Sequence, residues 1–193
     1  EDANARKRAR AFFETGCSVD HYDSCTQLAR SRTWGLGGPA AFDAAAAFLG
    51  PHCEHGDAIQ CVRRGHVAER RGDWVTARKD FLKACDGHEG WGFRAAGYTW
   101  GRGLGGPQSC VEQLRLVRLG CELGDESACW TVVGMLDSGI AGVANATDAR
   151  FQAEKLCRKS PDDCSPLAFL IRKSDPPRAV KLVGDACTRA TKD

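Results

Sequence analysis

The chain has 193 residues, a formal net charge of +2 and a sequence pI of about 8.1. This length suits one domain with a sizeable core or a row of small repeating units. The balanced charge gives no global field that favours nucleic acid, and no apolar run reaches the roughly 18 residues of a membrane span. We therefore expect no nucleic-acid partner and no membrane span, with a lipid anchor outside this sequence left open. The missing initiator Met and signal peptide suit a mature or trimmed chain.

Cysteine is unusually frequent in this sequence. The chain contains 11 cysteines, a proportion that is high for a protein kept reduced in the cytosol. The odd number leaves at least one Cys outside any intramolecular set of disulfides. We therefore predict an exported protein in an oxidising compartment, either secreted, periplasmic or on the cell surface. The heavy use of Ala, Arg and Gly points to a bacterial source.

Six cysteines mark a sequence repeat. They are separated by 36, 32, 36, 36 and 30 residues, which is the period of helical-hairpin arrays. Eight and four residues before each Cys stand small or apolar residues, with Gln113 as the exception. Residues at this spacing share one face of a helix that ends near the Cys. From the first unit to the last, these triplets are Ala9, Phe13 and Cys17; Ala45, Leu49 and Cys53; Ala77, Phe81 and Cys85; Gln113, Val117 and Cys121; Ala149, Ala153 and Cys157; and Ala179, Val183 and Cys187.

A second helix is expected after each of these segments. In four units another Cys follows the first by seven or eight residues, and a small residue that would admit a neighbouring helix comes next. Two of the Gly-rich loops that end these helices, 33–39 and 99–107, are near copies. Strand-type alternation is absent, so we predict an all-α fold. The paired positions are Cys25 and Ala29, Cys61 and Gly65, Cys129 with Gly134 displaced by one, and Cys164 and Ala168.

The spacing within each Cys pair favours a disulfide between two helices. On one continuous helix, residues eight apart lie about 12 Å apart along the axis, beyond the roughly 4.4–6.8 Å Cα separation of a disulfide. The intervening residues include turn and cap formers such as Asp20, Gly56, Gly124 and Pro161, so the chain can turn there. We predict the bridges Cys17–Cys25, Cys53–Cys61, Cys121–Cys129 and Cys157–Cys164.

Three cysteines have no partner in this register. Phe93 stands where the partner of Cys85 would be, and Cys187 would need a residue beyond the end of the sequence. Cys110 matches Phe42 and Trp74 of other units, as expected of a buried apolar residue. A disulfide between Cys85 and Cys110 is possible but not implied, because the repeat places them near opposite ends of adjacent helices.

Metal binding is the alternative role for the cysteines. One cluster comprises His52, Cys53, His55, Cys61 and His66, within fifteen residues, but the close Cys pairs of structural zinc sites are absent. Because Cys53 and Cys61 fit the bridge register, we expect no metal and no cofactor. Haem-attachment, hydrolase-nucleophile and metalloprotease motifs are also absent. We therefore predict no catalytic residues.

The helix and loop pattern resembles the Sel-1-like repeat family, relatives of the tetratricopeptide repeats. It is carried by Ala-x3-apolar-x3-Cys helices, the following Cys-x3-Gly and the Gly-x-Gly loops. The segment from Gly139 to Cys157 is similar to the loop-and-helix consensus, and the likeness is greatest to disulfide-rich secreted bacterial members. It covers about residues 3–187, with departures at Phe93, around Gly134 and in the shortened turn after Cys157.

The resemblance implies one α/α-hairpin solenoid, residues 1–193, wound as a right-handed superhelix of about five and a half repeats. The expected units are approximately 1–36, 37–72, 73–104, 105–142, 143–174 and a half repeat at 175–193. Such proteins usually act as adaptors, so we expect a non-enzymatic scaffold with a protein or peptide partner in its concave groove. Some cysteine-rich members bind penicillin-like ligands or show weak β-lactamase activity, which is the alternative, and a metal or redox carrier is the second.

If the groove is lined as in tetratricopeptide repeats, the second helix of each unit supplies it. Counted from the second Cys of each unit, or from Phe93 in the third unit, the residues one, five and eight positions later then point inward. Trp34 and Trp100 are expected to cap the ends of hairpins. Mixed charge with aromatic residues suits a peptide groove. The candidate groove residues are Arg30, His66, Glu69, Trp91, Arg94, Tyr98 and Arg172, with Val62 and Phe169 at equivalent positions.

Overall fold

The structure, a computed structural model, describes residues 2–140, 145–159 and 164–190, with side chains up to residue 184. Residues 141–144 of the predicted consensus segment from Gly139 to Cys157, and the predicted turn around Pro161, lie outside the described residues. Within the described ranges there are eleven α-helices and no strand, which confirms the all-α prediction, and none of these helices has the length and apolar character needed to cross a membrane. The helices are α1 (Ala3–Cys17), α2 (Tyr22–Trp34), α3 (Phe42–Glu54), α4 (Ala58–Arg70), α5 (Trp74–Asp86), α6 (Gly90–Arg102), α7 (Cys110–Glu122), α8 (Glu126–Ser138), α9 (Ala146–Lys159), α10 (Ser165–Ile171) and α11 (Pro176–Ala190).

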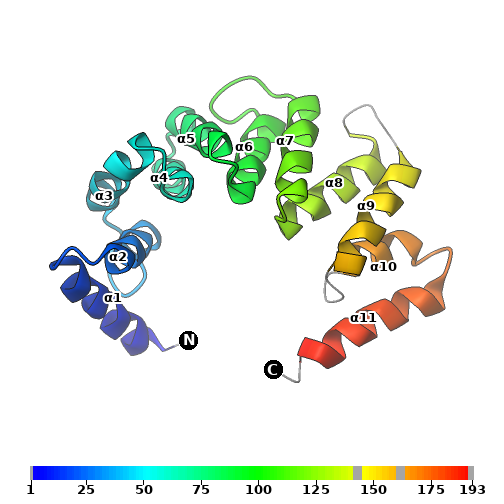
Figure 1. The fold of residues 1–193 in the computed structure, drawn as a ribbon, viewed down its shortest axis with the longest axis horizontal. Helices are drawn as coiled ribbons and strands as arrows, with labels where there is room; N and C mark the ends of the chain where they lie inside the picture. Colours follow the sequence, from blue (N-terminus) through cyan, green and yellow to red (C-terminus); the bar gives the residue numbers. More distant parts are fainter. Residues whose placement is uncertain (1, 141–144, 160–163, 191–193) are drawn as a thin grey trace.

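The helices follow one another around an arch whose two ends face each other across an opening (Figure 1). Each helix packs against the next one in the chain. The even-numbered helices also contact the even-numbered helix of the next hairpin, as expected on the inner side of a curved array. The molecule is therefore an α-solenoid, as predicted, and α2, α4, α6, α8 and α10 line its concave face.

Disulfides close four of the hairpins at the turn between their two helices. They join Cys17 to Cys25, Cys53 to Cys61, Cys121 to Cys129 and Cys157 to Cys164, and their Cα–Cα distances lie between 4.3 and 4.6 Å. In the chain-entropy model a loop of this size contributes about 2.5 kcal/mol per bridge. Such crosslinks suit hairpins that are too thin to bury a core of their own.

The hairpin of α5 and α6 has no bridge. Cys85 is a free thiol whose Sγ donates to the carbonyl oxygen of Phe81 at 3.3 Å, and Phe93 packs in the same core cluster. Burial raises the pKa of Cys85 to about 12. Cys110 is also free, and it is only partly buried because it is the first residue of α7. The side chain of Cys187 lies outside the described residues.

The outer helices bury the faces that the Cys register predicts, except at the two ends of the array. Ala45 and Leu49 of α3 are 0 % and 1 % exposed, as are Ala77 and Phe81 of α5. In α1, by contrast, no described residue is buried, and Ala9 is exposed. The first helix has a neighbour on one side only, so the same pattern buries less surface there.

Small residues admit the neighbouring helix at most of the predicted positions. A Cβ on Gly65 would overlap the ring of Phe81, so α4 and α5 can approach only because that atom is missing. The prediction for Gly134 is wrong: no atom lies within 4 Å of its would-be Cβ, and the buried Val133 occupies the contact. Gly97 of α6, which was not predicted, makes such a contact with α7, because a Cβ there would lie 2.8 Å from Cγ1 of Val117.

The two near-copied loops are anchored in the same way. Gly35 and Gly103 end α2 and α6 in the left-handed conformation, where a side chain would be strained. An arginine of the preceding outer helix then bonds the proline carbonyl of each loop, from Arg10 to Pro39 at 2.9 Å and from Arg78 to Pro107 at 3.2 Å.

Candidate functional site

Aromatic side chains are exposed along the inner helices of the arch. The rings belong to Trp34 of α2, Trp91 and Tyr98 of α6, and Phe169 of α10, and between 37 % and 45 % of each residue is accessible. Exposed aromatics on a concave surface are typical of binding faces, because they offer large contact areas with few rotatable bonds.

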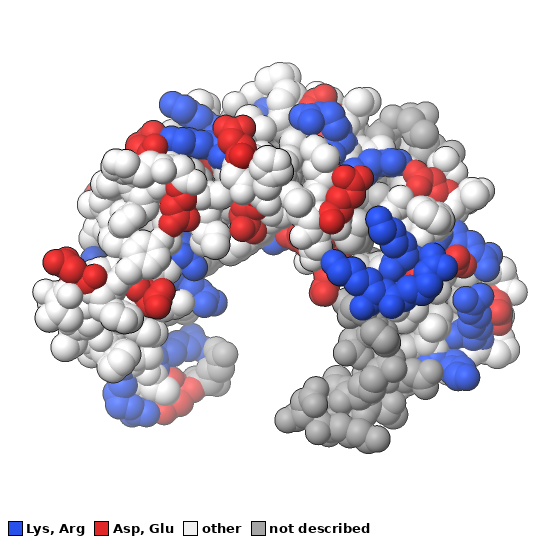
Figure 2. All heavy atoms as spheres, viewed as in Figure 1, with Lys and Arg blue, Asp and Glu red and all other residues white. Residues whose placement is uncertain are grey.

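An arginine accompanies each of these aromatic rings. The guanidinium carbon lies 3.7–6.0 Å from the ring centroid, within the range of cation–π contacts. Figure 2 shows basic atoms along the inner edge of the arch in its N-terminal half. The pairs are Arg70 with Trp34, Arg94 with Trp91, Arg102 with Tyr98, and Arg172 with Phe169.

A first cavity of about 370 Å³ lies between α2, α4 and α6. The imidazole of His66 stands between two indoles, with centroid distances of 6.0 Å to Trp34 and 5.3 Å to Trp91. Phe81 packs against the same imidazole from the core, at 5.2 Å. The cavity is lined by Arg30, Thr33 and Trp34 from α2, Arg63 and His66 from α4, and Trp91 from α6.

The two ring nitrogens of His66 have different surroundings. Nδ1 lies 2.7 Å from Oε2 of Glu69, which holds the ring in place. Nε2 is buried and has no hydrogen-bond partner among the described residues. A buried polar atom without a partner is costly, so this nitrogen marks a place where a bound group can supply one.

Arg63 is held in the first cavity by a partly buried polar network. Its Nη1 donates to Oε1 of Gln60 at 3.2 Å, and the Gln60 amide donates to the hydroxyl of Tyr22 at 2.8 Å. Tyr22 in turn donates to Asp57. Burial lowers the pKa of Arg63, and the like charge of nearby Arg30 acts in the same direction.

A second cavity of about 330 Å³ lies between α6, α7 and α8. Arg94, Tyr98 and Arg102 supply its α6 side. The Nε atom of Arg94 lies 3.0 Å from Oδ2 of Asp125, an ion pair that ties α6 to the start of α8. The rest of the lining comes from Gly101, Gln113, Val117, Ser127 and Thr131.

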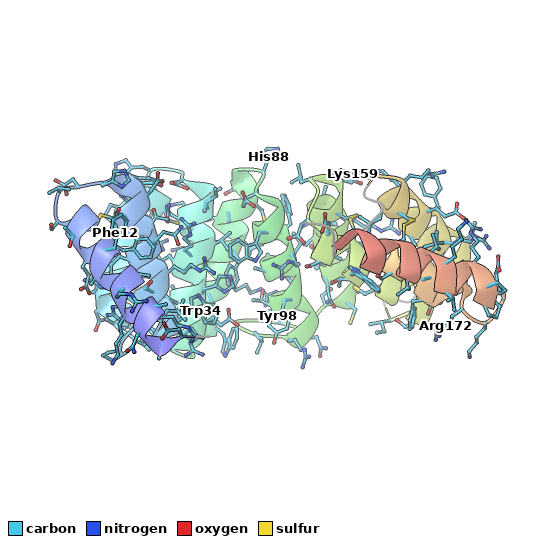
Figure 3. The ribbon with its side chains drawn as sticks, turned by 90° about the horizontal axis from the view of Figure 1, so that it is seen from below. Phe12, Trp34, His88, Tyr98, Lys159 and Arg172 are labelled. Atoms are coloured by element: carbon cyan, nitrogen blue, oxygen red, sulfur yellow. A yellow bond between two sulfur atoms is a disulfide. The ribbon has the colours of Figure 1, made fainter. Side chains whose placement is uncertain are left out.

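The structure divides the sequence-predicted groove residues among three places. Arg30, His66 and Trp91 line the first cavity, with Glu69 behind His66, and Arg94 and Tyr98 line the second. Arg172 lies apart, in an apolar hollow of about 640 Å³ beside α11. In the view into the opening, Trp34, Tyr98 and Arg172 lie along one edge of the molecule, and His88 and Lys159 lie along the other (Figure 3).

Two of the predicted orientations are wrong. Val62, expected to point inward, is 0 % exposed and belongs to the core. Trp34, expected to cap a hairpin, lines the first cavity. The near-copied loops are misleading here, because Trp34 directly precedes its left-handed glycine whereas Trp100 precedes Gly103 by three residues. A difference of two residues turns a side chain by about 200° around the helix.

Sequence reasoning also missed three arginines of the inner face. Positions five and nine after the Cys register, one helical turn apart, point inward in three successive hairpins. The prediction placed positions one, five and eight on the inner face and therefore missed Arg70 and Arg102 at position nine and Arg63 at position two. The pairs at positions five and nine are Arg30 and Trp34, His66 and Arg70, and Tyr98 and Arg102.

The histidine and cysteine cluster of the sequence does not converge. Cys53 and Cys61 are bonded to each other, His52 stacks on Phe48 at 4.7 Å, and His55 lies 2.6 Å from the carbonyl oxygen of Pro51. Among the described residues, no three His, Cys, Asp or Glu side chains are placed to hold a metal ion.

Neither a protein-family model nor a curated protein sequence matches this chain. Solved structures do match it. A protective antigen of uropathogenic Escherichia coli strains, which displays an SLR fold, superposes with a TM-score of 0.70 at 18 % identity, over 95 % of this chain and 41 % of the antigen. A Sel1 repeat protein from Oxalobacter formigenes superposes with a TM-score of 0.69 at 14 % identity, over 97 % of this chain and 79 % of that protein. This chain therefore has the Sel1-like repeat fold and spans less than half the length of the antigen.

Proposed function

We propose that this Sel1-type solenoid is a non-enzymatic binding scaffold whose concave face takes a peptide or protein segment. The observation that carries the proposal is the inner face itself. The first and third hairpins expose aromatic rings there, each ring has an arginine beside it, and α6 contributes to two cavities of this face. Tyr, Trp and Arg are the residues that dominate the binding energy of protein interfaces.

The disulfides support an exported location for the protein. Four bridges in one small chain suit an oxidising, exported compartment rather than the cytosol. A secreted, periplasmic or cell-surface location is therefore part of the proposal. In such a compartment a stapled solenoid offers a preformed groove, which lowers the ordering cost of binding.

Selection from a random peptide library tests the proposal. The immobilised oxidised protein is expected to enrich a convergent set of peptides. The double variant W91S/Y98S should bind synthetic versions of these peptides about 30-fold more weakly, corresponding to the loss of about 2 kcal/mol at an interface anchor.

The control variant removes exposed apolar side chains from outer helices. Val75 and Val111 are 69 % and 64 % exposed on α5 and α7, so V75S/V111S should leave the affinity unchanged. Absence of any convergent peptide, or equal losses in both double variants, would contradict binding in the concave groove.

A further inference from the structure

We propose that the first cavity, between Arg30, Arg63 and His66, recognises a carboxylate of the bound segment. This inference deepens the proposed function and rests on it, because it names the chemical group that the groove selects. The carboxylate can come from an Asp or Glu side chain or from a chain terminus, and the experiment below separates these sources.

Two arginines that line one cavity carry the argument. Arg30 and Arg63 come from different helices. Burial lowers the pKa of Arg63, and the charge of nearby Arg30 lowers it further, although Asp57 acts in the opposite direction. Neither forms an ion pair with a carboxylate of the described residues, unlike Arg64, Arg94 and Arg118 elsewhere in the molecule. An anionic group between the two arginines would relieve this repulsion and accept hydrogen bonds from both guanidinium groups.

One of the two arginines, Arg63, is held in place, whereas Arg30 is exposed. Arg63 is partly buried and uses Nη1 on Gln60, within the network that includes Tyr22. Its remaining N–H groups are available to a ligand, because a guanidinium has five donors in a planar fork. Preorganised donors bind a carboxylate at less entropic cost than freely rotating ones.

His66 and the two indoles define the rest of the ligand. The buried Nε2 atom of His66 has no partner in the described part of the chain, and it can donate a hydrogen bond from a protonated ring or accept one in a neutral ring. A peptide segment offers both carboxylate oxygens and backbone N–H groups, so it matches either state. Trp34 and Trp91 flank this position and offer apolar surface to the stem of the acidic residue.

The size and charge of the site fit this ligand. A volume of about 370 Å³ falls in the lower part of the roughly 300–1,000 Å³ range of ligand pockets. Glu69, the carboxylate nearest to His66, already accepts from Nδ1 of that ring. Arg70 over Trp34 adds a further positive charge at the rim.

The test uses the peptides enriched by the oxidised wild-type protein. We expect them to be rich in Asp or Glu, or to require a free C-terminus. Amide replacement of the acidic residues, or amidation of the C-terminus, identifies the source of the carboxylate. Fluorescence polarisation should show roughly a tenfold or greater loss of affinity for the replacement that removes the recognised group.

The matched protein variants are R30Q/R63Q and R115Q/R150Q. Arg115 and Arg150 are exposed on the outer helices α7 and α9, where each pairs with a Glu of its own helix. Both double variants lose two charges, but only R30Q/R63Q should lose roughly tenfold or more in affinity. This loss should not add to that of the neutralised peptide, because both changes remove the same interaction.

The possible outcomes separate this inference from the proposed function. Convergent peptides without acidic residues or a C-terminal requirement would overturn the carboxylate site and leave the groove standing. Equal weakening of charged and neutralised peptides by R30Q/R63Q would do the same. A library that yields no convergent peptide would overturn both.

Discussion

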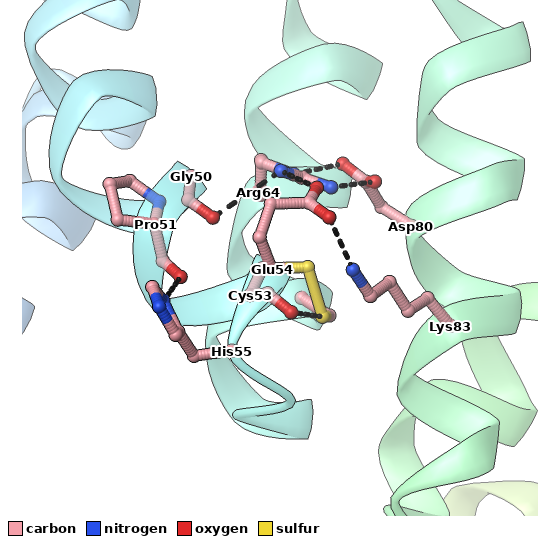
Figure 4. Close-up of polar contacts among 9 residues, drawn as sticks. Gly50, Pro51, Cys53, Glu54, His55, Arg64, Asp80 and Lys83 are labelled. Atoms are coloured by element: carbon pink, nitrogen blue, oxygen red, sulfur yellow. Dashed lines mark hydrogen bonds and ion pairs between the residues drawn. A yellow bond between two sulfur atoms is a disulfide. The ribbon is translucent and has the colours of Figure 1, made fainter.

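At the scale of single residues, the joint between the second and third hairpins depends on an ionic cluster. Arg64 of α4 donates to both carboxylate oxygens of Asp80 on α5, at 2.8 and 2.6 Å, and Asp80 is almost completely buried (Figure 4). Glu54, at the end of α3, accepts from Arg64 at 2.7 Å and from Lys83 at 2.5 Å. Three helices therefore meet at one guanidinium.

Glu54 should make stability depend on pH in the acid range. Lys83 first, and then Arg64, hold the pKa of Glu54 at about 2, below its ordinary value of 4.5. A carboxylate with a lowered pKa stabilises the folded state above its ordinary value, and this contribution is lost as the pH falls through the folded value. The difference in unfolding free energy between wild type and E54Q should therefore be present at pH 7 and disappear between about pH 4.5 and 2.

Denaturant titrations at several pH values measure this difference. Added salt should also reduce it at neutral pH, because Glu54 is largely exposed and its ion pairs are screened. A difference that stays constant from pH 7 to pH 2 would show that the cluster does not stabilise the fold.

At the scale of helices, close approach between neighbours depends on the residue that faces the contact. Gly65 lies under the ring of Phe81, where a methyl group has no room, whereas Gly134 has nothing within 4 Å. Both glycines are inside helices, so the backbone entropy gained on replacing them by alanine is similar.

The variants G65A and G134A should therefore change stability in opposite directions. We expect G65A to lower the unfolding free energy by about 1–3 kcal/mol through overpacking. In contrast, G134A should raise it by about 0.5–1 kcal/mol, the helix-propensity gain of Ala over Gly. Thermal and denaturant unfolding of the two proteins measure the difference, and equal effects in both would contradict the assigned contact.

The sequence predicts the helices of this fold better than it predicts the residues of the inner face. The helices and their order follow from the Cys and Ala register, because a repeated apolar spacing fixes which face of each helix is buried. The inner face is harder to predict, because a shift of one or two residues moves a side chain to another face. Val62 and Trp34 were assigned to the wrong faces for this reason, and Gly134 shows that a displaced small residue need not make the contact.

At the scale of the whole molecule, the two halves of the arch expose different kinds of side chain on the inner face. The arginine and aromatic pairs of α2, α4 and α6 lie at two cavities of the inner face, while the hollow near α11 is mainly apolar. The first and last helices leave apolar side chains such as Phe12 and Val180 exposed, at 71 % and 73 %. The division into five and a half repeats at the predicted boundaries stays a prediction.

Disulfide register is the feature on which the turns of four hairpins of the arch depend. Each bridge fixes the turn of one hairpin, and the turn sets which residues of the second helix point inward. The unbridged hairpin of α5 and α6 must hold its place through Cys85, Phe93 and their core neighbours. The thiol of Cys85, with a pKa of about 12, should resist alkylation in the folded protein.

A non-reducing peptide map of the native protein, with free thiols alkylated before digestion, tests this account most directly. The account predicts four bridged peptides, Cys17–Cys25, Cys53–Cys61, Cys121–Cys129 and Cys157–Cys164, and a Cys85 that reacts fully only after unfolding. Alkylation of those eight cysteines in the native protein, or bridges between different hairpins, would contradict it.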